Sequence, residues 1–314
     1  MKLEEIKSYF DEFCINNEVM ECAYSFYYFY LNIYKSVTKE FKVYNYKNAI
    51  FIIYIFGKSI RVPYLPLVKF NVFENQREYL KICNMFFKKI PKKEFKIISV
   101  PNNFHDLLDG DFKIRKYDTD YIYSTEQYVF MAGAKFKPIR RYYNKFVNNY
   151  KKDGIIFKEI DVKNVSGCLE LINNWAREAK EDRNIFRVFD TNSNRVWINN
   201  YSNDIVPQRN YCLLVGNKIV ALTGFFETYP NADHYYFFIS KNDFEYDGSM
   251  YYIIVESFRD LYKKGILKVN YAGSIGMNGL KQFKLKLKPI QFLDNYNLFV
   301  DTEYDMKYKV KSVL

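Results

Sequence analysis

The sequence predicts an α/β protein whose chain forms two successive series of strands and helices. Segments with the alternation of a strand and segments with the helical spacing of apolar residues follow one another along the chain. This order occurs twice, and Asp153-Gly154 interrupts the pattern between the two series. An apolar fraction of 49% with 26% charged residues is typical of a globular protein with a sizeable core. We therefore expect two domains, residues 1–150 and 151–314, related by a structural duplication.

The first series begins with an amphipathic helix over residues 2–14, where Leu3, Ile6 and Phe10 belong to one apolar stripe. Residues 22–37 are aromatic and apolar nearly all round, which predicts a buried helix. The remaining elements are a strand pair over 41–62, a helix over 74–89, a strand over 95–100, a short helix over 102–108, and strands over 112–117 and 121–123.

The second series has a similar order of elements. It starts with a strand over 155–160 and an amphipathic helix over 165–179, followed by a polar, helix-containing stretch over 183–203. A hairpin is predicted around Gly216-Asn217, with a neighbouring strand over 234–240. A helix over 251–261 and a short strand over 266–271 complete the series.

A basic helix is predicted over residues 134–152, at the end of the first domain. It contains seven cations and no acidic residue: Lys135, Lys137, Arg140, Arg141, Lys145, Lys151 and Lys152. Aromatic residues are interleaved with them, at Tyr142, Tyr143, Phe146 and Tyr150. This combination suits contacts with phosphates and stacking on bases. The alternative is a linker helix whose aromatic side chains belong to the core.

Residues 270–289, NYAGSIGMNGLKQFKLKLKP, form the most distinctive segment. Its glycines are Gly273, Gly276 and Gly279. A strand, a glycine-rich loop and a helix in this order expose backbone N–H groups that can bind a carboxylate, a phosphate or a developing oxyanion. Three lysines recur at helical spacing and are expected on one face: Lys281, Lys284 and Lys288. The alternative is a glycine turn followed by a solvated basic helix.

The net charge of +11 favours a polyanionic partner, either a nucleic acid or an anionic membrane face. Lys, Asn, Ile, Tyr and Phe are abundant together, as expected of an AT-rich genome, and this bias explains part of the charge. Since no window approaches the roughly 18 apolar residues of a membrane span, we expect a cytoplasmic protein that can contact the inner membrane face.

Several classes of chemistry lack their sequence signals. There is no G-x-S-x-G elbow, no P-loop and no G-x-G-x-x-G after a strand. His105 and His234 lie far apart, so no metal site is expected. The five cysteines are scattered and follow no signal peptide, which predicts free thiols in a reducing compartment.

The hairpin, loop and helix over residues 211–261 resemble the acetyltransferase fold called GNAT. In that fold the amides of a loop, Arg/Gln-x-x-Gly-x-Gly/Ala, bind the pyrophosphate of coenzyme A. The matching residues 244–250, FEYDGSM, contain one glycine and two carboxylates, which would repel a pyrophosphate. We therefore expect the GNAT fold without coenzyme A at the usual place.

Two longer blocks resemble the C-terminal domain of phosphatidylglycerol lysyltransferases and, more remotely, the Fem peptidyltransferases of cell-wall synthesis. The block from DYIY at 120–123 through GAKF at 133–136 to Phe146 is similar to that family's DYxY…GKKxxxKRNxxxxF. Residues 270–289 are similar to its NxExDxGxxGLRxxKxxxxP, and residues 216–221 to its central hairpin. The resemblance implies two tandem GNAT-like domains, each a mixed twisted sheet flanked by helices, with aminoacyl-tRNA as donor.

This chain departs from the second pattern at three positions. Ala272 and Ser274 stand where the family has two acids, and Lys281 replaces an arginine. These departures bear on lysyl specificity if the two acids position the donor amine or transfer a proton.

The resemblance implies an acyltransferase that uses no metal or cofactor besides its donor, with tRNA as partner. An amine or hydroxyl acceptor, on a lipid, a peptide or a small molecule, would attack the acyl carbon directly in a cleft between the halves. Amides of the 273–279 turn and Lys281 would stabilise the oxyanion, with Ser274 as a further hydrogen-bonding residue. Asp247, or failing it Glu227, would take the proton. The expected substrate-binding residues are Asn270, Gly273, Gly276, Gly279, Lys284, Lys135, Lys137, Arg140, Arg141 and Lys145.

Two other functions remain open from the sequence. One is an N-acyltransferase that uses a thioester of coenzyme A or of an acyl carrier protein at a remodelled site. The other is a non-catalytic module that binds RNA or anionic lipid through the basic helix.

Overall fold

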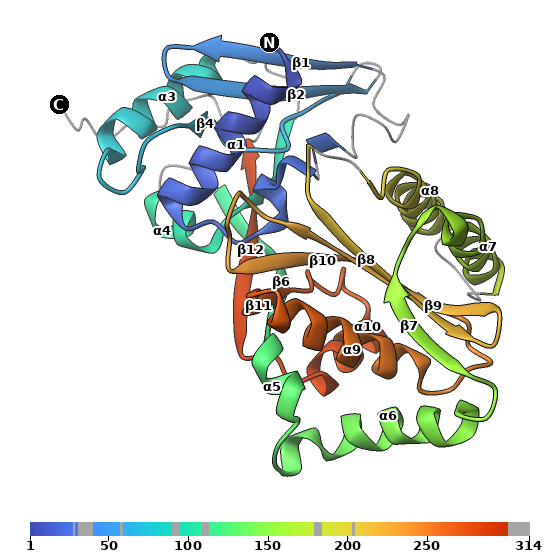
Figure 1. The fold of residues 1–314 in the computed structure, drawn as a ribbon. Coiled ribbons are helices and arrows are strands. Elements are labelled where there is room, and N and C mark those ends of the chain that lie inside the picture. The colour runs from blue at the N-terminus through green and yellow to red at the C-terminus, as the bar shows by residue number, and fades with distance from the viewer. Residues whose placement is uncertain are drawn as a thin grey trace. The chain divides into compact units, whose positions relative to one another are not determined.

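The computed structural model describes residues 1–27, 29–30, 40–56, 59–89, 95–108, 113–178, 184–202 and 205–300 (Figure 1). The chain forms two compact units. The first consists of Met1–Asp120, Thr228–Pro230 and the C-terminal segment from Leu293, and the second of Tyr121–Glu227 and Asn231–Phe292. Strands β6 (Lys113–Ser124) and β12 (Gln291–Val300) each have residues in both units.

The first unit contains antiparallel strands and short helices. In its sheet β1 (Glu40–Tyr46), β2 (Ala49–Phe56) and β3 (Ser59–Arg61) are neighbours in that order, and β4 (Leu67–Val68) also pairs with β2. A separate antiparallel pairing joins β5 (Phe95–Val100) to β12. The helical elements are α1 (Leu3–Asn17), η1 (Cys22–Tyr24), α3 (Gln76–Lys89), η2 (Asn102–Phe104) and α4 (His105–Leu108).

Aromatic rings fill the core of the first unit, which accounts for much of the unusual aromatic content. The Phe13 ring of α1 stacks on those of Tyr24 at 4.8 Å and Phe104 at 5.5 Å, and the Phe10 ring meets Tyr64 edge-on at 5.0 Å. Phe10 and Phe13 are fully buried, so the predicted amphipathic first helix is confirmed.

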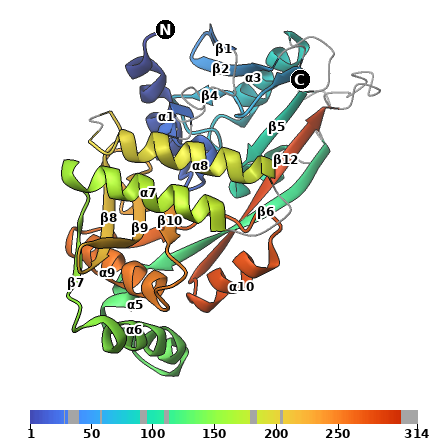
Figure 2. The same ribbon diagram turned by 90° about the vertical axis from the view of Figure 1, so that its right-hand side faces the viewer.

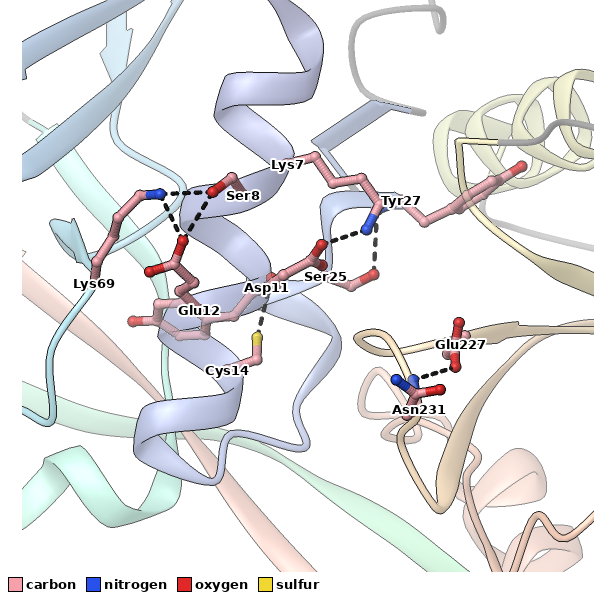
Figure 3. A network of polar contacts seen from close by, with 11 residues as sticks. Lys7, Ser8, Asp11, Glu12, Cys14, Ser25, Tyr27, Lys69, Glu227 and Asn231 are labelled. Carbon is pink, nitrogen blue, oxygen red and sulfur yellow. Dashed lines mark hydrogen bonds and ion pairs between the residues drawn. The ribbon is translucent and has the colours of Figure 1, made fainter.

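The opposite side of α1 carries a polar network (Figure 3). Lys69, which follows β4, places its Nζ 2.6 Å from the Ser8 hydroxyl and 2.6 Å from a Glu12 carboxylate oxygen. These contacts join α1 to the segment after β4 through side chains that remain partly exposed.

Two carboxyl groups are buried in the same unit, at Glu21 and Asp120. The Glu21 carboxylate accepts the N–H of Asn102 at 3.0 Å and that of Met20 at 3.1 Å. Burial, assisted by the charge of Asp120, raises the pKa of Glu21 to about 7.

The second unit is built on a mixed sheet in the strand order β6-β11-β10-β9-β8-β7. Its strands are β7 (Ile155–Glu159), β8 (Gln208–Val215), β9 (Lys218–Glu227), β10 (His234–Asn242) and β11 (Lys268–Asn270), together with the end of β6. Strands β10 and β11 are parallel, and the other pairs are antiparallel.

Helices cover both faces of this sheet (Figures 1 and 2). On one face lie α7 (Val162–Glu178) and α8 (Asn184–Asn199), which run side by side. The elements outside that layer are α5 (Thr125–Phe130), η3 (Ala134–Phe136), α6 (Lys137–Tyr150), α9 (Ser249–Lys263) and α10 (Asn278–Lys286). Adjacent residues of β9 show the two faces: the Phe226 ring contacts Trp197 of α8, and the Phe225 ring contacts Phe258 of α9.

The predicted fold class, α/β with a mixed sheet flanked by helices, is confirmed by this architecture. The compact units do not divide at residue 150, because β6 pairs with β11 and α6 packs on α9, so residues from Tyr121 onward belong to the second unit. A division into GNAT-like domains at residues 150 and 151 stays a prediction. Part of the aromatic helix predicted over 22–37 lies outside the described residues, and the sequence did not predict β12.

Candidate functional site

Strands β10 and β11 run side by side for a short distance and then part. Their paired residues are His234 with Lys268, Tyr235 with Val269 and Tyr236 with Asn270. Just beyond, Phe237 and Ile239 pair with consecutive residues of β9, so Phe238 is the extra residue of a β-bulge. Bulges interrupt pairing and are frequent beside active sites. The divergence follows the carboxyl end of β11 at Asn270, whereas β10 continues along β9 to Asn242.

The loop that follows β11 has an unusual backbone. Ala272, Ile275 and Gly276 all have left-handed conformations, with φ angles of 55°, 53° and 69°. A residue with a side chain costs about 1 kcal/mol or more in this conformation. The loop therefore depends on interactions that hold it in place.

Lys284 of α10 provides three of these interactions. Its ammonium group donates to the carbonyl oxygens of Tyr271, of Ala272 at 3.1 Å and of Gly273 at 2.6 Å. The side chain is buried, with 3% of the residue exposed. A buried ammonium group is stable only where hydrogen bonds replace its hydration, and the three carbonyls do so here.

The Tyr271 side chain lies at the base of the divergence. Its ring stacks on Phe237 of β10 at 4.0 Å, and Lys284 Nζ lies 4.4 Å from the ring centre. The Tyr271 hydroxyl is hydrogen-bonded to the hydroxyl of Ser240 on β10. Burial raises the pKa of Tyr271, so the phenol stays protonated at neutral pH. The sequence analysis missed Ser240 and Tyr271, because only the pairing of two separate strands brings them together.

The predicted loop residues differ in burial. Asn270 is fully buried, and its side-chain oxygen accepts the N–H of Ala272 at 2.8 Å. Ser274 is buried and its carbonyl accepts the N–H of Met277 at 2.9 Å. Gly273 is also buried, whereas Gly276 and Gly279 are exposed. Asn270, Gly273 and Ser274 therefore form one compact turn beside the divergence.

The predicted lysine face of the α10 region is wrong. Lys281 is exposed, Lys284 is buried, and Lys288 lies beyond the helix with a φ of 64°. The three would share a face only if the helix continued to residue 288, but it ends at Lys286. The expected phosphate contact of Lys284 is also wrong, because its ammonium group is directed into the protein and donates to backbone carbonyls. The Lys281 side chain makes no hydrogen bond or ion pair with another described residue.

The aromatic side chains of the basic helix α6 face α9. Three ring pairs join the two elements and the loop before α9: Tyr142 with Tyr251 at 4.5 Å, Tyr143 with Tyr252 at 4.8 Å and Tyr150 with Tyr246 at 5.1 Å. The interpretation of these residues as stacking platforms for bases is therefore wrong, because their rings are already in contact with other tyrosines. The alternative, that they belong to the packing of the protein, agrees with the structure.

Helix α6 packs against part of the loop over 244–250, the loop predicted to correspond to the coenzyme A loop of the GNAT fold, while Phe244, Glu245 and Asp247 remain exposed. Gly248 has a φ of 89°, and a Cβ atom added there would lie 2.6 Å from the Tyr142 carbonyl oxygen and 3.1 Å from the Phe146 side chain. The Tyr150 hydroxyl donates to the Glu245 carbonyl at 3.3 Å. Helix α6 thus lies directly against the start of α9, where a pyrophosphate would have to approach.

The predicted cations of this region fall into two groups. Three of them are engaged within the protein: Lys135 with Gln127 at 3.0 Å, Arg140 with the carbonyls of Met131 and Gly133, and Lys145 with Asp247. Lys137 and Arg141 are exposed, and their side chains make no hydrogen bond or ion pair with the rest of the described chain. These two remain available to an anionic partner.

The two predicted proton acceptors have different surroundings. Asp247 belongs to the loop over 244–250, is about half exposed and is paired with Lys145 of α6. Glu227 ends β9, and its carboxylate accepts the N–H of Asn231 at 2.7 Å (Figure 3). Their roles in proton transfer stay predictions.

Two further features of the described residues bear on the site. No group of three or more His, Cys, Asp or Glu side chains within them could hold a metal ion. A cavity of about 280 Å³ lies between α7 and the β8–β9 hairpin, and its lining includes Lys163, Gly167 and Asp243 but no residue predicted for the site.

Comparison with known protein families assigns the chain to one of them. Residues 93–299 match the family described as "Phosphatidylglycerol lysyltransferase, C-terminal". The chain belongs to this family. The predicted relation to phosphatidylglycerol lysyltransferases is thereby confirmed, and the chain is placed among acyltransferases. The two longer blocks of resemblance both lie within the matched residues.

Solved structures of similar fold include relatives of this family. A conserved protein of unknown function from Bacteroides thetaiotaomicron has 17% identity and a TM-score of 0.74, covering 96% of this chain and 98% of its own. L-PGS from Bacillus licheniformis has 14% identity and a TM-score of 0.58, covering 86% and 90%. FemX has 9% identity and a TM-score of 0.58, covering 94% and 96%. At these identities the likeness shows the fold alone. A search of curated protein sequences finds no match.

Over the described ranges, no helix has both the length and the apolar character needed to span a bilayer.

Proposed function

We propose that this chain transfers an aminoacyl group from aminoacyl-tRNA to an amine or hydroxyl acceptor at the divergence of β10 and β11. The observation that carries the choice of donor is the packing of α6 against Gly248 and the Glu245 carbonyl, on the side from which coenzyme A would approach in the GNAT fold. The same helix presents Lys137 and Arg141 to solvent, where they suit the phosphates of an RNA.

The chemistry requires little more than position and stabilisation of charge. The acceptor attacks the ester carbon of the donor and forms a tetrahedral oxyanion. When the oxyanion collapses, the ester C–O bond breaks, and the proton lost by the acceptor is transferred to the leaving tRNA hydroxyl oxygen. Holding the two reactants together supplies part of the rate, and backbone N–H groups of the 273–276 loop stabilise the oxyanion. Lys281, exposed on the same short helix as Lys284, is our candidate for a contact with donor or intermediate.

The acceptor that fits best is a lipid at an anionic membrane face. Apolar side chains flank α10 in sequence and are exposed: Ile275 at 50%, Met277 at 36%, Ile290 at 44% and Phe292 at 53%. No acidic residue occurs from Leu261 to Leu293, whereas seven lysines do. Exposed apolar groups with cations are typical of surfaces that rest on anionic lipid.

The decisive experiment compares donors. The purified protein is incubated with charged total tRNA and anionic lipid vesicles, and separately with acyl-coenzyme A, and the lipids and small amines are analysed by mass spectrometry. Aminoacylated lipid or amine from the tRNA reaction alone supports the proposal. A product from acyl-coenzyme A alone refutes it and favours the thioester alternative.

The role of α6 is tested by charge reversal. In the variant Lys137→Glu/Arg141→Glu, the slope of log affinity for tRNA against log salt should become shallower by about 2, because each neutralised phosphate contributes about 0.9. Lys163→Glu, an exposed lysine on α7, is the matched control and should leave the slope unchanged. Equal slopes in both variants would show that tRNA binds at another surface of the protein. Strong tRNA binding without product from any donor would favour the non-catalytic binding module.

A further inference from the structure

The Lys284 ammonium group fixes the orientation of successive peptide units. A trans peptide holds its C=O and N–H in one plane and in opposite directions, and the structure has no cis peptide bond in its described residues. The Ala272 carbonyl is directed at Lys284 Nζ at 3.1 Å and also accepts the N–H of Tyr121 at 3.3 Å. The N–H of Gly273, which belongs to the same peptide unit, therefore points away from the ammonium group.

The neighbouring peptide units are fixed in the same way. The Tyr271 carbonyl also binds Lys284, and the N–H of its peptide unit, on Ala272, donates to the Asn270 side chain. The Gly273 carbonyl lies 2.6 Å from Nζ. Three consecutive carbonyls thus converge on one cation, within a loop whose backbone is left-handed at Ala272.

The burial of the Lys284 ammonium group costs free energy, and this cost is explained if the conformation of the loop is needed for function. Burying an ammonium group carries a large desolvation penalty, and an apolar side chain of similar length would fill the same space without it. Two other lysines of α10, Lys281 and Lys286, are exposed and avoid this penalty.

We propose that Lys284 is a positioning residue, whose ammonium group turns the Gly273 N–H away from itself and toward the anion that forms on the reacting carbonyl. The inference rests on the proposed function for the identity of that anion, but the orientation of the amide does not. Lys284 acts through the backbone and does not touch the substrate. No other residue in α10 provides such a link.

The test follows the Gly273 amide directly. The chain has 12 glycines, so selective labelling with ¹⁵N-glycine gives a simple amide spectrum, in which Gly273→Ala identifies the Gly273 signal. Inorganic phosphate serves as the tetrahedral anion. Lys284→Met removes the charge and keeps the length, Lys284→Arg keeps a charge, and Lys286→Met is the exposed control on the same helix.

The expected result has two parts. Phosphate shifts the Gly273 signal in the wild type and in Lys286→Met, fails to do so in Lys284→Met, and does so partly in Lys284→Arg. With the proposed aminoacyl-tRNA donor, kcat of Lys284→Met falls at least about 100-fold while KM stays within about twofold, as for removal of one oxyanion donor. A residue that serves stability alone would not separate kcat from KM in this way at a temperature where the variant is folded.

Each contrary outcome has a distinct meaning. An unchanged phosphate response in Lys284→Met, or no response of Gly273 in the wild type, overturns the positioning role. A kcat of Lys284→Met within twofold of Lys286→Met overturns it as well. If the wild type transfers nothing from any donor while the phosphate response still depends on Lys284, the proposed function fails and the orientation of the amide by Lys284 stands.

Discussion

The buried carboxyl group of Glu21 makes the stability of the first unit depend on pH. Its pKa is about 7 in the folded protein, against an ordinary value of 4.5. Between these values the folded chain holds a proton that the unfolded chain has released. Stability is therefore highest below the ordinary value, falls as pH rises, and the loss is complete above about pH 7. From pH 5 to pH 8 this one group should reduce the free energy of unfolding by about 2.5 kcal/mol.

Glu21→Gln removes the titration and keeps an oxygen that can accept the Asn102 N–H. Any cost of placing the amide beside the Met20 N–H is independent of pH and cancels from the slope. Urea unfolding is followed by far-ultraviolet circular dichroism at pH 5, 6, 7 and 8. The difference between variant and wild type should shift by about 2.5 kcal/mol in favour of the variant as the pH rises.

A second carboxyl group, that of Glu12, tests whether the direction of the pH effect on stability is predicted correctly. Lys69 lowers the pKa of Glu12, so this group contributes stability that is present at neutral pH and is lost as the pH falls. Glu12→Gln should therefore reduce the loss of stability below about pH 4.5, opposite in direction to Glu21→Gln, and should leave the slope between pH 5 and 8 unchanged. Wild-type and Glu21→Gln free energies that stay parallel within about 0.5 kcal/mol from pH 5 to 8 would refute the reasoning.

Three further substitutions test the second unit. Gly248→Ala should lower the free energy of unfolding by about 1–3 kcal/mol more than Gly265→Ala. Both glycines have positive φ, but only at Gly248 does an α6 atom lie within 3 Å of the added Cβ. Equal losses in the two variants would show that α6 does not pack tightly against that loop. In Gly224→Ala the new Cβ would lie 2.7 Å from the Trp197 indole nitrogen, so tryptophan emission should shift to the red with a loss of about 1–3 kcal/mol, and an unchanged spectrum would contradict the packing. Lys281→Ala should change stability by less than about 0.5 kcal/mol while lowering turnover at least tenfold; comparable effects on both would argue against a role in transfer.

Local patterns predicted elements well where periodicity was strong. The helices over 165–179 and 251–261 and the hairpin around Gly216 all occur, because their apolar faces pack on the sheet of the second unit. The signals were weaker for β6, predicted as two pieces although its residues 113–124 form one strand. Strand β12 follows Pro289, which was interpreted only as the end of the basic segment.

The site was predicted less completely, because its contacts are distant in sequence. Composition identified the cations and tyrosines of α6, but the partners of those tyrosines lie about a hundred residues later on α9. The motif pointed to the 270–276 loop, yet nothing local distinguishes Lys284 from Lys281, and only the three carbonyls of the folded loop explain why Lys284 is buried. Ser240 carries no signal, because its relevance depends on Tyr271 of a different strand.

Because the end of β6 belongs to the sheet of the second unit, a truncated fragment keeps a complete sheet only if it includes these residues. A fragment starting at residue 151 would lack Ile122–Ser124, leaving the edge of β11 open to pairing with another chain. It would also lack α6, so the aromatic surface of α9 around Tyr251 and Tyr252 would be exposed to water. Such a fragment should aggregate on expression, whereas one starting at Tyr121 retains both neighbours.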